Sequence, residues 1–201
     1  MPTISETLMI NKIPNIVARF LFVLLACIWL SSVFALDLPS SRNPKYNSAI
    51  NPKYKSSINP NYNSSINPKY NSSLNPIYNS SINPSYNSFI NPKYNSSINP
   101  KYNSSLNPMY NSSIDPTKTT WSGLYIFDED SELSGVAVWA ERGFLLYFGL
   151  SGKWQGYFVS DNKSGYNWFS LEDEWQGYCV NNLERGLNIF TKDGEWIGFM
   201  N

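Results

Sequence analysis

Six aromatic residues in the last third of the chain recur at a spacing that could build a ligand site. They are three tryptophans spaced twenty-one residues apart, each followed three positions later by a second aromatic residue: Trp154, Trp175 and Trp196, then Tyr157, Tyr178 and Phe199. Aromatic faces that converge can hold a cation through cation–π attraction or line an apolar pocket. These six residues are the candidate ligand-binding residues, for a small apolar or cationic ligand.

The residue types that most catalytic chemistry needs are missing or scattered. The chain has no histidine and two cysteines, Cys27 and Cys179, which excludes the usual zinc sites and histidine-dependent catalytic schemes. Cys179 stands on an alternating strand pattern, where a lone cysteine is usually a small core residue. Acidic residues cluster at 128–132 and 172–174, in expected turns, and their spacing matches no calcium loop. We expect no enzyme activity, catalytic residue, metal site or cofactor.

The aromatic positions belong to a four-fold repeat that runs through residues 121–201. A phenylalanine ends a short apolar run every twenty-one residues, and a glycine follows eight positions later. The phenylalanines are Phe127, Phe148, Phe169 and Phe190, and the glycines are Gly135, Gly156, Gly177 and Gly198. Apolar and aromatic runs on either side of a short turn predict a β-hairpin in each repeat.

The four glycines are predicted to interrupt strands rather than turns. A glycine inside a strand usually marks a bulge, a sharp bend or the close approach of another backbone. A domain of about 80 residues with open sheet edges would be fragile, whereas four hairpins closed around a pseudo-four-fold axis have no free edge. The predicted fold is an all-β ring of four hairpins. Its tryptophans either form stacked layers of the core or line a pocket or exposed face.

The repeat resembles the four-fold β-flower family of bacterial proteins. The resemblance is carried by an aromatic residue, a short turn and Trp-Gln-Gly-Tyr, in the segments 147–159, 168–180 and 189–200, with a weaker first copy at 126–138. It implies an all-β flower of four hairpins, often behind a membrane or export segment, with no established activity. The repeat is also similar to choline-binding repeats of bacterial surface proteins, which implies an open solenoid with ligand cages between repeats.

Residues 43–114 are nine copies of an octapeptide with the consensus Asn-Pro-x-Tyr-Asn-Ser-Ser-Ile. A proline every eight residues breaks helices and central strands, and asparagine and serine favour local turns. One Tyr and one Ile or Leu per copy are too few to order the chain in isolation. The segment is predicted to be an extended, low-complexity spacer or stalk. The alternative is a regular coil that stacks its Tyr and Ile rows.

Two short motifs recur within the octapeptides. Asn-Pro-x-Tyr resembles the internalisation signal that cytoplasmic adaptor domains read, but a secreted chain carries it on the wrong side of the membrane. The glycosylation motif Asn-x-Ser has meaning only in a cell that glycosylates secreted proteins. It occurs at Asn63, Asn71, Asn79, Asn95, Asn103, Asn111 and Asn162.

Residues 1–35 are predicted to be a signal peptide or a membrane anchor. Lys12 and Arg19 precede the apolar run FLFVLLACIWL at 20–30, and a Val-x-Ala cleavage site ends at Ala35. An uncleaved anchor, a lipoprotein signal around Cys27 and a buried helix of a soluble domain are the alternatives. All but the last predict an extracytoplasmic protein that is membrane-anchored or secreted.

The zero net charge of the chain hides a basic middle and an acidic end. Residues 42–114 carry seven basic and no acidic side chains, whereas residues 115–201 carry thirteen acidic and six basic ones. The lysines are spread too thinly for a nucleic-acid site, so a solvated segment is expected.

These features predict a non-enzymatic cell-envelope or secreted protein with a structural or interaction role. The alternative function is an aromatic-cage binder of choline or glycan at the cell surface. The expected partner is a membrane or cell-envelope component, with a small apolar or cationic ligand as a further option and no nucleic acid. The sequence leaves the oligomeric state open.

Overall fold

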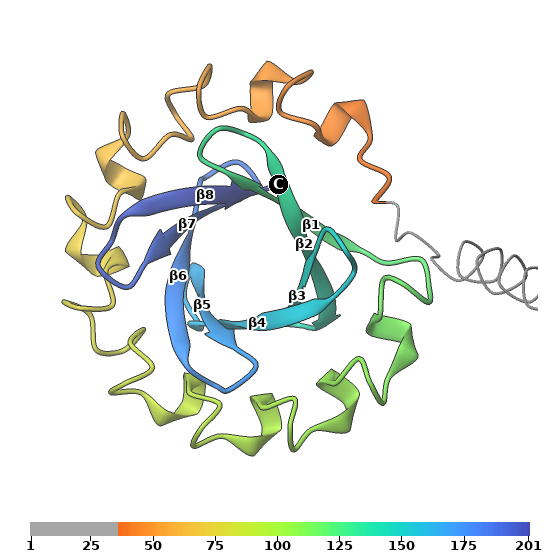
Figure 1. Ribbon diagram of the computed structural model, residues 1–201. Coiled ribbons are helices and arrows are strands. Elements are labelled where there is room, and N and C mark those ends of the chain that lie inside the picture. Colours follow the sequence, from red (N-terminus) through yellow and green to blue (C-terminus); the bar gives the residue numbers. More distant parts are fainter. Residues whose placement is uncertain (1–35) are drawn as a thin grey trace, which may run out of the picture. The chain divides into compact units, whose positions relative to one another are not determined.

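A computed structural model describes residues 36–201. The predicted signal peptide or membrane anchor at 1–35, with its apolar helix, lies outside the described residues. Residues 36–201 belong to one compact unit with two parts: a barrel formed by residues 121–201, and a surrounding segment, residues 40–120, that we call the collar (Figure 1). Within residues 36–201, no helix has the length and apolar character needed to cross a membrane.

Eight antiparallel strands close into a barrel in chain order. The strands are β1 Gly123–Asp128, β2 Leu133–Glu141, β3 Phe144–Gly149, β4 Trp154–Ser160, β5 Gly165–Ser170, β6 Trp175–Asn181, β7 Leu187–Thr191 and β8 Trp196–Met200. Since β1 pairs with both β2 and β8, the sheet has no free edge. The prediction of a closed all-β fold is confirmed.

Each of the four repeated glycines lies against the backbone of a neighbouring strand. A Cβ atom at Gly135, Gly156, Gly177 or Gly198 would stand 2.2–2.4 Å from the carbonyl oxygen of one of the four repeated phenylalanines. The hydrogen-bond register also shifts just before each glycine. The extra residue forms a bulge, which bends the strand and increases its twist. Glycine is therefore required by close backbone approach beside a bulge.

The barrel interior is filled by one set of alternating side chains. Residues from most of the strands form this inner cluster, and no collar residue belongs to it: Ile126, Ala137, Leu145, Phe158, Cys179, Leu187, Ile189 and Met200. An eight-stranded barrel has an interior that such side chains can just fill. Burial raises the pKa of the Cys179 thiol, which keeps this core group in its neutral form.

The outer face of the barrel is also apolar. All four repeated phenylalanines belong to clusters on this face, together with Tyr157, Tyr178 and Phe199. Four ring pairs stack across neighbouring strands with centroid separations of 5.2–5.7 Å: Phe127 with Phe199, Phe144 with Tyr157, Tyr157 with Phe169, and Tyr178 with Phe190. Strands such as β3 are almost continuous apolar runs, a pattern typical of strands buried on both faces. This face needs a cover.

The octapeptides supply that cover by winding around the barrel (Figure 1). A one-turn 3-10 helix, η1 Ser40–Arg42, precedes the first copy. Each copy begins with a turn, and most copies end with a one-turn 3-10 helix: η2 Ser48–Ile50, η3 Ser64–Ile66, η4 Ser72–Leu74, η5 Ser88–Ile90, η6 Ser96–Ile98, η7 Ser104–Leu106 and η8 Ser112–Ile114. The Ile or Leu of most copies is buried. Leu106 and Ile114 join the outer-face cluster around Phe127 and Phe148, and Leu74 packs against Tyr178.

The collar differs from the extended spacer that the composition favoured. That prediction counted the apolar residues available to an isolated octapeptide segment. In the structure the Ile and Leu row is buried against a ready-made apolar surface, so the collar does not have to form a core of its own. The alternative of a regular coil describes the backbone better, although only its Ile and Leu row is packed and its Tyr row is exposed.

Two asparagines in most copies join that copy to the preceding one. The first donates its Nδ2 to a proline carbonyl seven residues earlier and accepts at Oδ1 from a backbone N–H two residues later, as Asn51 does with Pro44 at 2.9 Å and Lys53 at 2.8 Å. The second donates to a carbonyl six residues earlier, as Asn63 does with Ser57 at 2.7 Å. Only an amide side chain offers both a donor and an acceptor in this geometry.

The series of octapeptides ends where the first asparagine of a copy is replaced by an aspartate. Asp115 begins an incomplete tenth copy, and its carboxylate side chain has no N–H to donate to a proline carbonyl. Its carboxylate instead accepts from Thr117 and forms an ion pair with Lys118 at 2.8 Å. Burial works to raise the pKa of Asp115, but these hydrogen bonds outweigh it and leave the pKa lowered.

Contacts between collar and barrel recur at matched intervals. Asn188 donates Nδ2 to the carbonyl of Ile58 at 3.1 Å, and Asn167 donates to the carbonyl of Ile82 at 3.0 Å. The two collar residues are 24 positions apart, which is three octapeptides, and the two barrel residues are 21 apart, which is one hairpin repeat. Three octapeptides therefore span one hairpin, and nine copies match three of the four hairpins.

Candidate functional site

The six predicted aromatic site residues do not converge on one pocket. Trp154, Trp175 and Trp196 stand at the starts of β4, β6 and β8, partly buried against the outer-face clusters. Tyr157, Tyr178 and Phe199 are at most 2% exposed in the same outer layer. The structure distributes the six around the outside of the barrel, where they pack, and neither stacks them inside it nor forms a cage from them.

The polar atoms of this layer are satisfied unevenly. Trp154 donates Nε1 to the carbonyl of Gly156 at 2.8 Å, and Tyr157 donates its hydroxyl to Asp173 at 2.5 Å. Tyr178 has no partner for its hydroxyl among residues 36–201, nor do Trp175 and Trp196 for their indole N–H groups. Burial raises the pKa of both tyrosines, and Asp173 raises that of Tyr157 further, so both phenols are neutral.

A cavity of about 200 Å³ lies at the end of the barrel where the turns after β1, β3, β5 and β7 gather. We call it the mouth pocket. Three of its wall residues are the aromatic side chains Tyr147, Phe158 and Trp168, whose ring centroids are 6.1–6.2 Å apart. The other apolar residues that line it are Ile126, Phe127, Ile189 and Ile197, and the polar ones are Asp128 and Ser134. Burial raises the pKa of Tyr147, so its phenol is neutral too.

The mouth pocket was missed from the sequence although its walls follow the repeat. Its residues Ile126, Tyr147, Trp168 and Ile189 each stand immediately before one of the repeated phenylalanines. Because side chains alternate along a strand, the residue before an outward phenylalanine points inward. The alternation of side chains along each strand therefore predicts the inward residues that line the pocket. The Trp-Gln-Gly-Tyr motif instead marks aromatic residues on the outer face of the barrel.

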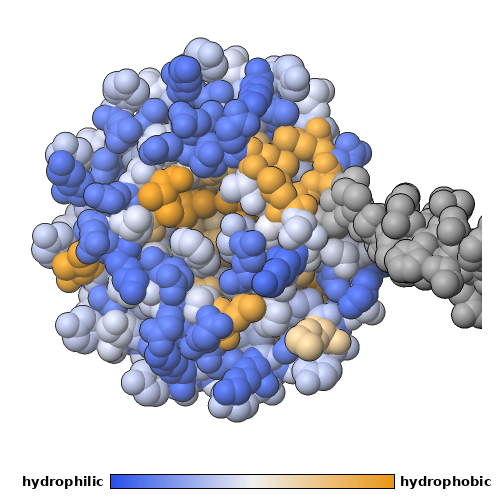
Figure 2. Space-filling view, viewed as in Figure 1, coloured by the Kyte–Doolittle hydropathy of each residue, from blue (hydrophilic) through white to orange (hydrophobic). Residues whose placement is uncertain are grey.

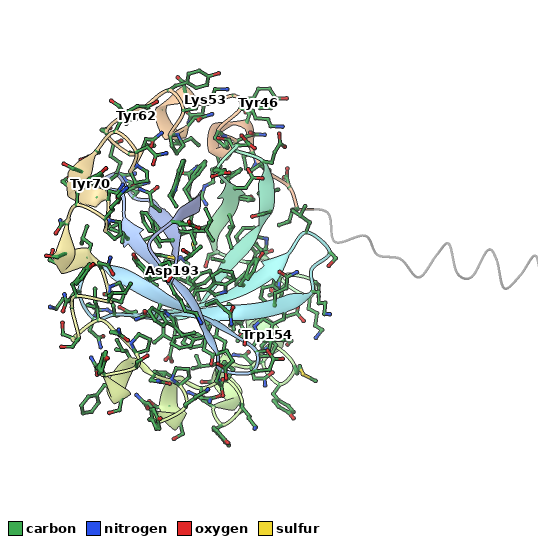
Figure 3. The ribbon with its side chains drawn as sticks, turned by 60° about the vertical axis from the view of Figure 1, so that its left-hand side comes forward. Tyr46, Lys53, Tyr62, Tyr70, Trp154 and Asp193 are labelled. Carbon is green, nitrogen blue, oxygen red and sulfur yellow. The ribbon has the colours of Figure 1, made fainter. Side chains whose placement is uncertain are left out.

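The collar presents a ring of tyrosines to solvent. The fourth residue of every octapeptide is a tyrosine that is 67–78% exposed: Tyr46, Tyr54, Tyr62, Tyr70, Tyr78, Tyr86, Tyr94, Tyr102 and Tyr110. We call this set the tyrosine ring. Figure 3 shows the labelled Tyr46, Tyr62 and Tyr70 at the outer edge, pointing away from the barrel.

The octapeptides carry basic side chains and the barrel is mostly acidic, and some of these charges form ion pairs where the two parts are in contact. Three of the collar lysines pair with barrel glutamates: Lys45 with Glu132, Lys55 with Glu184, and Lys93 with Glu174. These pairs explain part of the charge asymmetry of the sequence. Lys69 and Lys101 instead lie over the rings of their neighbouring tyrosines, with centroid distances of 5.7 and 5.5 Å.

Six of the seven glycosylation motifs fall in the collar, where their asparagines already have a structural role. In each of these copies the asparagine Nδ2 donates to a carbonyl of the preceding copy, and Oδ1 caps the following turn, as at Asn63 and Asn103. Among residues 36–201, no group of three or more His, Cys, Asp and Glu side chains could hold a metal ion. No family model, curated protein or solved structure matches this chain.

Proposed function

We propose that this protein is a non-enzymatic, extracytoplasmic interaction module that binds an extended polysaccharide through the tyrosine ring. The barrel, which we take to be β-flower-like with pseudo-four-fold symmetry, acts as the scaffold that holds the ring in shape. The single observation that carries the proposal is the exposure of the same aromatic residue in all nine octapeptides. The extracytoplasmic location rests on the sequence of residues 1–35.

Folding does not account for these tyrosines. A side chain that is 67–78% exposed buries little apolar surface, so it adds little to stability. The neighbouring third position is also exposed in the collar, and there the nine copies carry five residue types: Lys, Asn, Ile, Ser and Met. The third position of the octapeptide therefore varies, whereas the fourth position, which is equally exposed, is always tyrosine. A binding role for the tyrosines explains why only the fourth position is constant.

The composition around the ring suits a glycan. Tyrosine offers a large, rigid, amphipathic contact area at low entropic cost, and asparagine and serine offer adaptable hydrogen bonds. The outer surface of residues 42–114 combines these three residue types and has no carboxylate. Seen along the barrel axis, the surface around the rim is mostly hydrophilic (Figure 2). Sugar rings present apolar C–H faces for stacking and hydroxyls for hydrogen bonds.

A polysaccharide suits the tyrosine ring better than a single sugar or a nucleic acid does. Nine equivalent positions at a constant interval of eight residues can engage a repeating ligand at several points, which multiplies weak contacts. Nucleic acid would need a dense phosphate-binding cluster. Three of the collar lysines are already paired with barrel glutamates, which leaves too few for that purpose.

Two binding assays on the full chain test the proposal. The first is co-sedimentation with insoluble polysaccharides, and the second is affinity electrophoresis through gels that contain soluble acidic polysaccharides. The triple variant Tyr62→Ser/Tyr70→Ser/Tyr78→Ser should bind at least about tenfold more weakly, because contacts made together are lost together. Its unfolding free energy should stay within about 0.5 kcal/mol of the parent value, since the changed side chains are exposed.

A matched control removes exposed apolar surface without touching the ring. Ile77, Phe89 and Met109 are 53%, 79% and 75% exposed on the same collar. The variant Ile77→Ser/Phe89→Ser/Met109→Ser should keep its affinity within about twofold. The proposal fails if the parent binds none of the polysaccharides, or if this control loses as much affinity as the tyrosine variant does.

A further inference from the structure

We propose that the mouth pocket binds a small organic cation, a ligand distinct from the polymer assigned to the tyrosine ring. The pocket lies inside the barrel end, and the ring lies on the outside of the collar. The two sites share no residue. Each proposal can therefore fail without the other.

The size of the cavity limits the ligand. Pockets for drug-sized ligands have volumes of about 300–1,000 Å³, whereas the mouth pocket has about 200 Å³. It is nevertheless several times larger than the roughly 30 Å³ that one water molecule occupies in the liquid. A ligand with a handful of heavy atoms, such as a methylated ammonium group with a short side arm, fits this volume.

The walls of the cavity suit a cation with apolar substituents. Tyr147, Phe158 and Trp168 contribute three aromatic rings, with Tyr147 edge-on to Trp168 and Phe158 stacked on Trp168. Aromatic faces attract a cation electrostatically, and the attraction grows when the cation is partly desolvated, as it would be in a cavity. The same walls make van der Waals contact with methyl groups.

The rim of the pocket adds a fixed negative charge. Asp128 lines the cavity at the end of β1. Its Oδ1 accepts hydrogen bonds from the backbone N–H groups of Asp130 and Glu132, at 3.0 and 2.8 Å. Both bonds end on one oxygen, and Oδ2 makes no hydrogen bond to residues 36–201. The turn thus fixes the carboxylate of a residue that lines the cavity, and its second oxygen has no partner among the described residues.

The turns at the mouth end of the barrel add further negative charge around the pocket. The segments 128–132, 149–153, 170–174 and 191–195 together contain nine acidic and two basic residues. Glu132 and Glu174 are neutralised by collar lysines, and Asp173 accepts from Tyr157, but the remainder keep the rim acidic. An acidic rim over an aromatic cavity concentrates cations and repels anions.

Isothermal titration of the full chain with choline and with its neutral isostere 3,3-dimethylbutan-1-ol tests the charge requirement directly. The two molecules have nearly the same shape and differ in the positive charge. Choline should bind at a stoichiometry of one, and the alcohol should bind at least about tenfold more weakly because it gains no cation–π or carboxylate attraction. Raising the salt concentration should weaken choline binding, because the rim is exposed to solvent.

Variants of the pocket identify the site. Asp128→Asn keeps an oxygen for the turn hydrogen bonds and removes the charge, and Trp168→Phe keeps an aromatic ring but a weaker cation–π face. Each should weaken choline binding about three- to tenfold. The matched controls are Glu141→Gln and Trp139→Phe, both near the end of β2 that lies away from the mouth, and neither residue lines the cavity. Both controls should bind as the parent does.

Three outcomes overturn the proposal. The first is absence of choline binding to a chain that unfolds cooperatively, and the second is equal binding of the neutral isostere, which would indicate a purely apolar pocket. The third is a loss of affinity in the controls that matches the loss in the pocket variants. Thermal denaturation of every variant separates loss of the site from loss of the fold.

Discussion

Individual residues show how one repeated position acquires different partners in different copies. Tyr157 and Tyr178 are equivalent positions, each buried and each sixteen residues before an equivalent turn position. In one copy that turn position is Asp173, which accepts the tyrosine hydroxyl and also a hydrogen bond from Asn99 at 2.8 Å. In the other copy it is Gly194, and the Tyr178 hydroxyl has no partner among the described residues. The repeat thus leaves one buried phenol unsatisfied.

The variant Gly194→Asp should supply the missing acceptor. Gly194 has φ +87°, while Asp173 adopts φ +62° at the equivalent position, so an aspartate is accommodated there. A Cβ at Gly194 would stand 3.3 Å from the Tyr178 hydroxyl. The control Gly152→Asp occupies the same turn position at φ +75°, but its equivalent partner is Val136, which has no hydroxyl.

Both substitutions place an aspartate at a positive φ, so the control accounts for the backbone strain. Measuring both variants at high salt reduces the effect of the neighbouring charges, Asp193 in one turn and Lys153 in the other. Gly194→Asp should be more stable than Gly152→Asp by about 1 kcal/mol, which is the typical net contribution of an intramolecular hydrogen bond. Urea denaturation at pH 7 measures both. Equal stability of the two variants would show that Tyr178 does not gain a partner.

The collar and the barrel depend on each other as elements. None of the three apolar clusters is formed by collar residues alone: Leu106 and Ile114 belong to a cluster built on the strands, and Leu74 and Ile98 pack against such clusters. Its asparagines fix the distance between copies, and the match of three octapeptides to one hairpin brings equivalent groups of the collar to equivalent places on the barrel. Two of the three ion pairs at the boundary have the same spacing: Lys45 to Lys93 is 48 residues and Glu132 to Glu174 is 42, twice the two intervals.

These ion pairs make the attachment of the collar sensitive to pH. Hydrogen bonds from Lys93 and Lys55 lower the pKa of Glu174 and of Glu184 from the ordinary value of 4.5. A carboxyl whose pKa is lowered by folding contributes stability that is present above the ordinary pKa and is lost as the pH falls through the lowered value. The double variant Glu174→Gln/Glu184→Gln should therefore be less stable than the parent at pH 7, and the difference should disappear toward pH 3.

Denaturant unfolding curves recorded from pH 7 to pH 3 check this pattern. The control Glu172→Gln removes an acidic residue that forms no ion pair among residues 36–201, so its curve should follow the parent at each pH. A difference between parent and double variant that is constant over the whole range would contradict the assignment. High salt should shrink the difference at pH 7, because the pairs are solvent-exposed.

The whole molecule is a barrel with two apolar faces, only one of which it can bury by itself. Side chains inside the barrel cover one another, whereas the outward phenylalanines and tyrosines lose contact with water only because the collar lies over them. A contiguous exposed apolar face of this kind leads to association in soluble proteins. The collar is therefore part of the folded domain and not an attachment to it.

Residues 121–201 produced without the collar should not behave as an independent domain. We expect this fragment to aggregate or to bind a hydrophobic dye strongly, because Phe127, Phe148 and their neighbours become exposed. Size-exclusion chromatography and dye fluorescence, with residues 36–201 as the control, measure the difference. A soluble, monomeric fragment that unfolds cooperatively would show that the outer face needs no cover.

The sequence by itself determined the repeat, the strands and the closure of the barrel. Periodic glycines, alternating apolar residues and short turns act locally or between neighbours in the chain, so their spacing carries the information. It also predicted that the octapeptides would not order in isolation, and it showed that a basic segment precedes an acidic one. The tertiary structure decided what those facts mean.

Only the tertiary structure assigned the faces of the barrel and the place of the octapeptides. The bulge before each repeated glycine changes which side chains of the strand point inward and which point outward. These bulges therefore decide whether an aromatic residue faces outward, as Trp154 does, or inward, as Trp168 does. Whether an apolar side chain of the octapeptides is buried depends on a distant part of the chain. Leu74, for example, packs against a cluster of Tyr178, Val180 and Phe190, more than one hundred residues further on. Long-range packing leaves no local periodicity to detect, because it is a property of two segments that fit each other and of neither one alone.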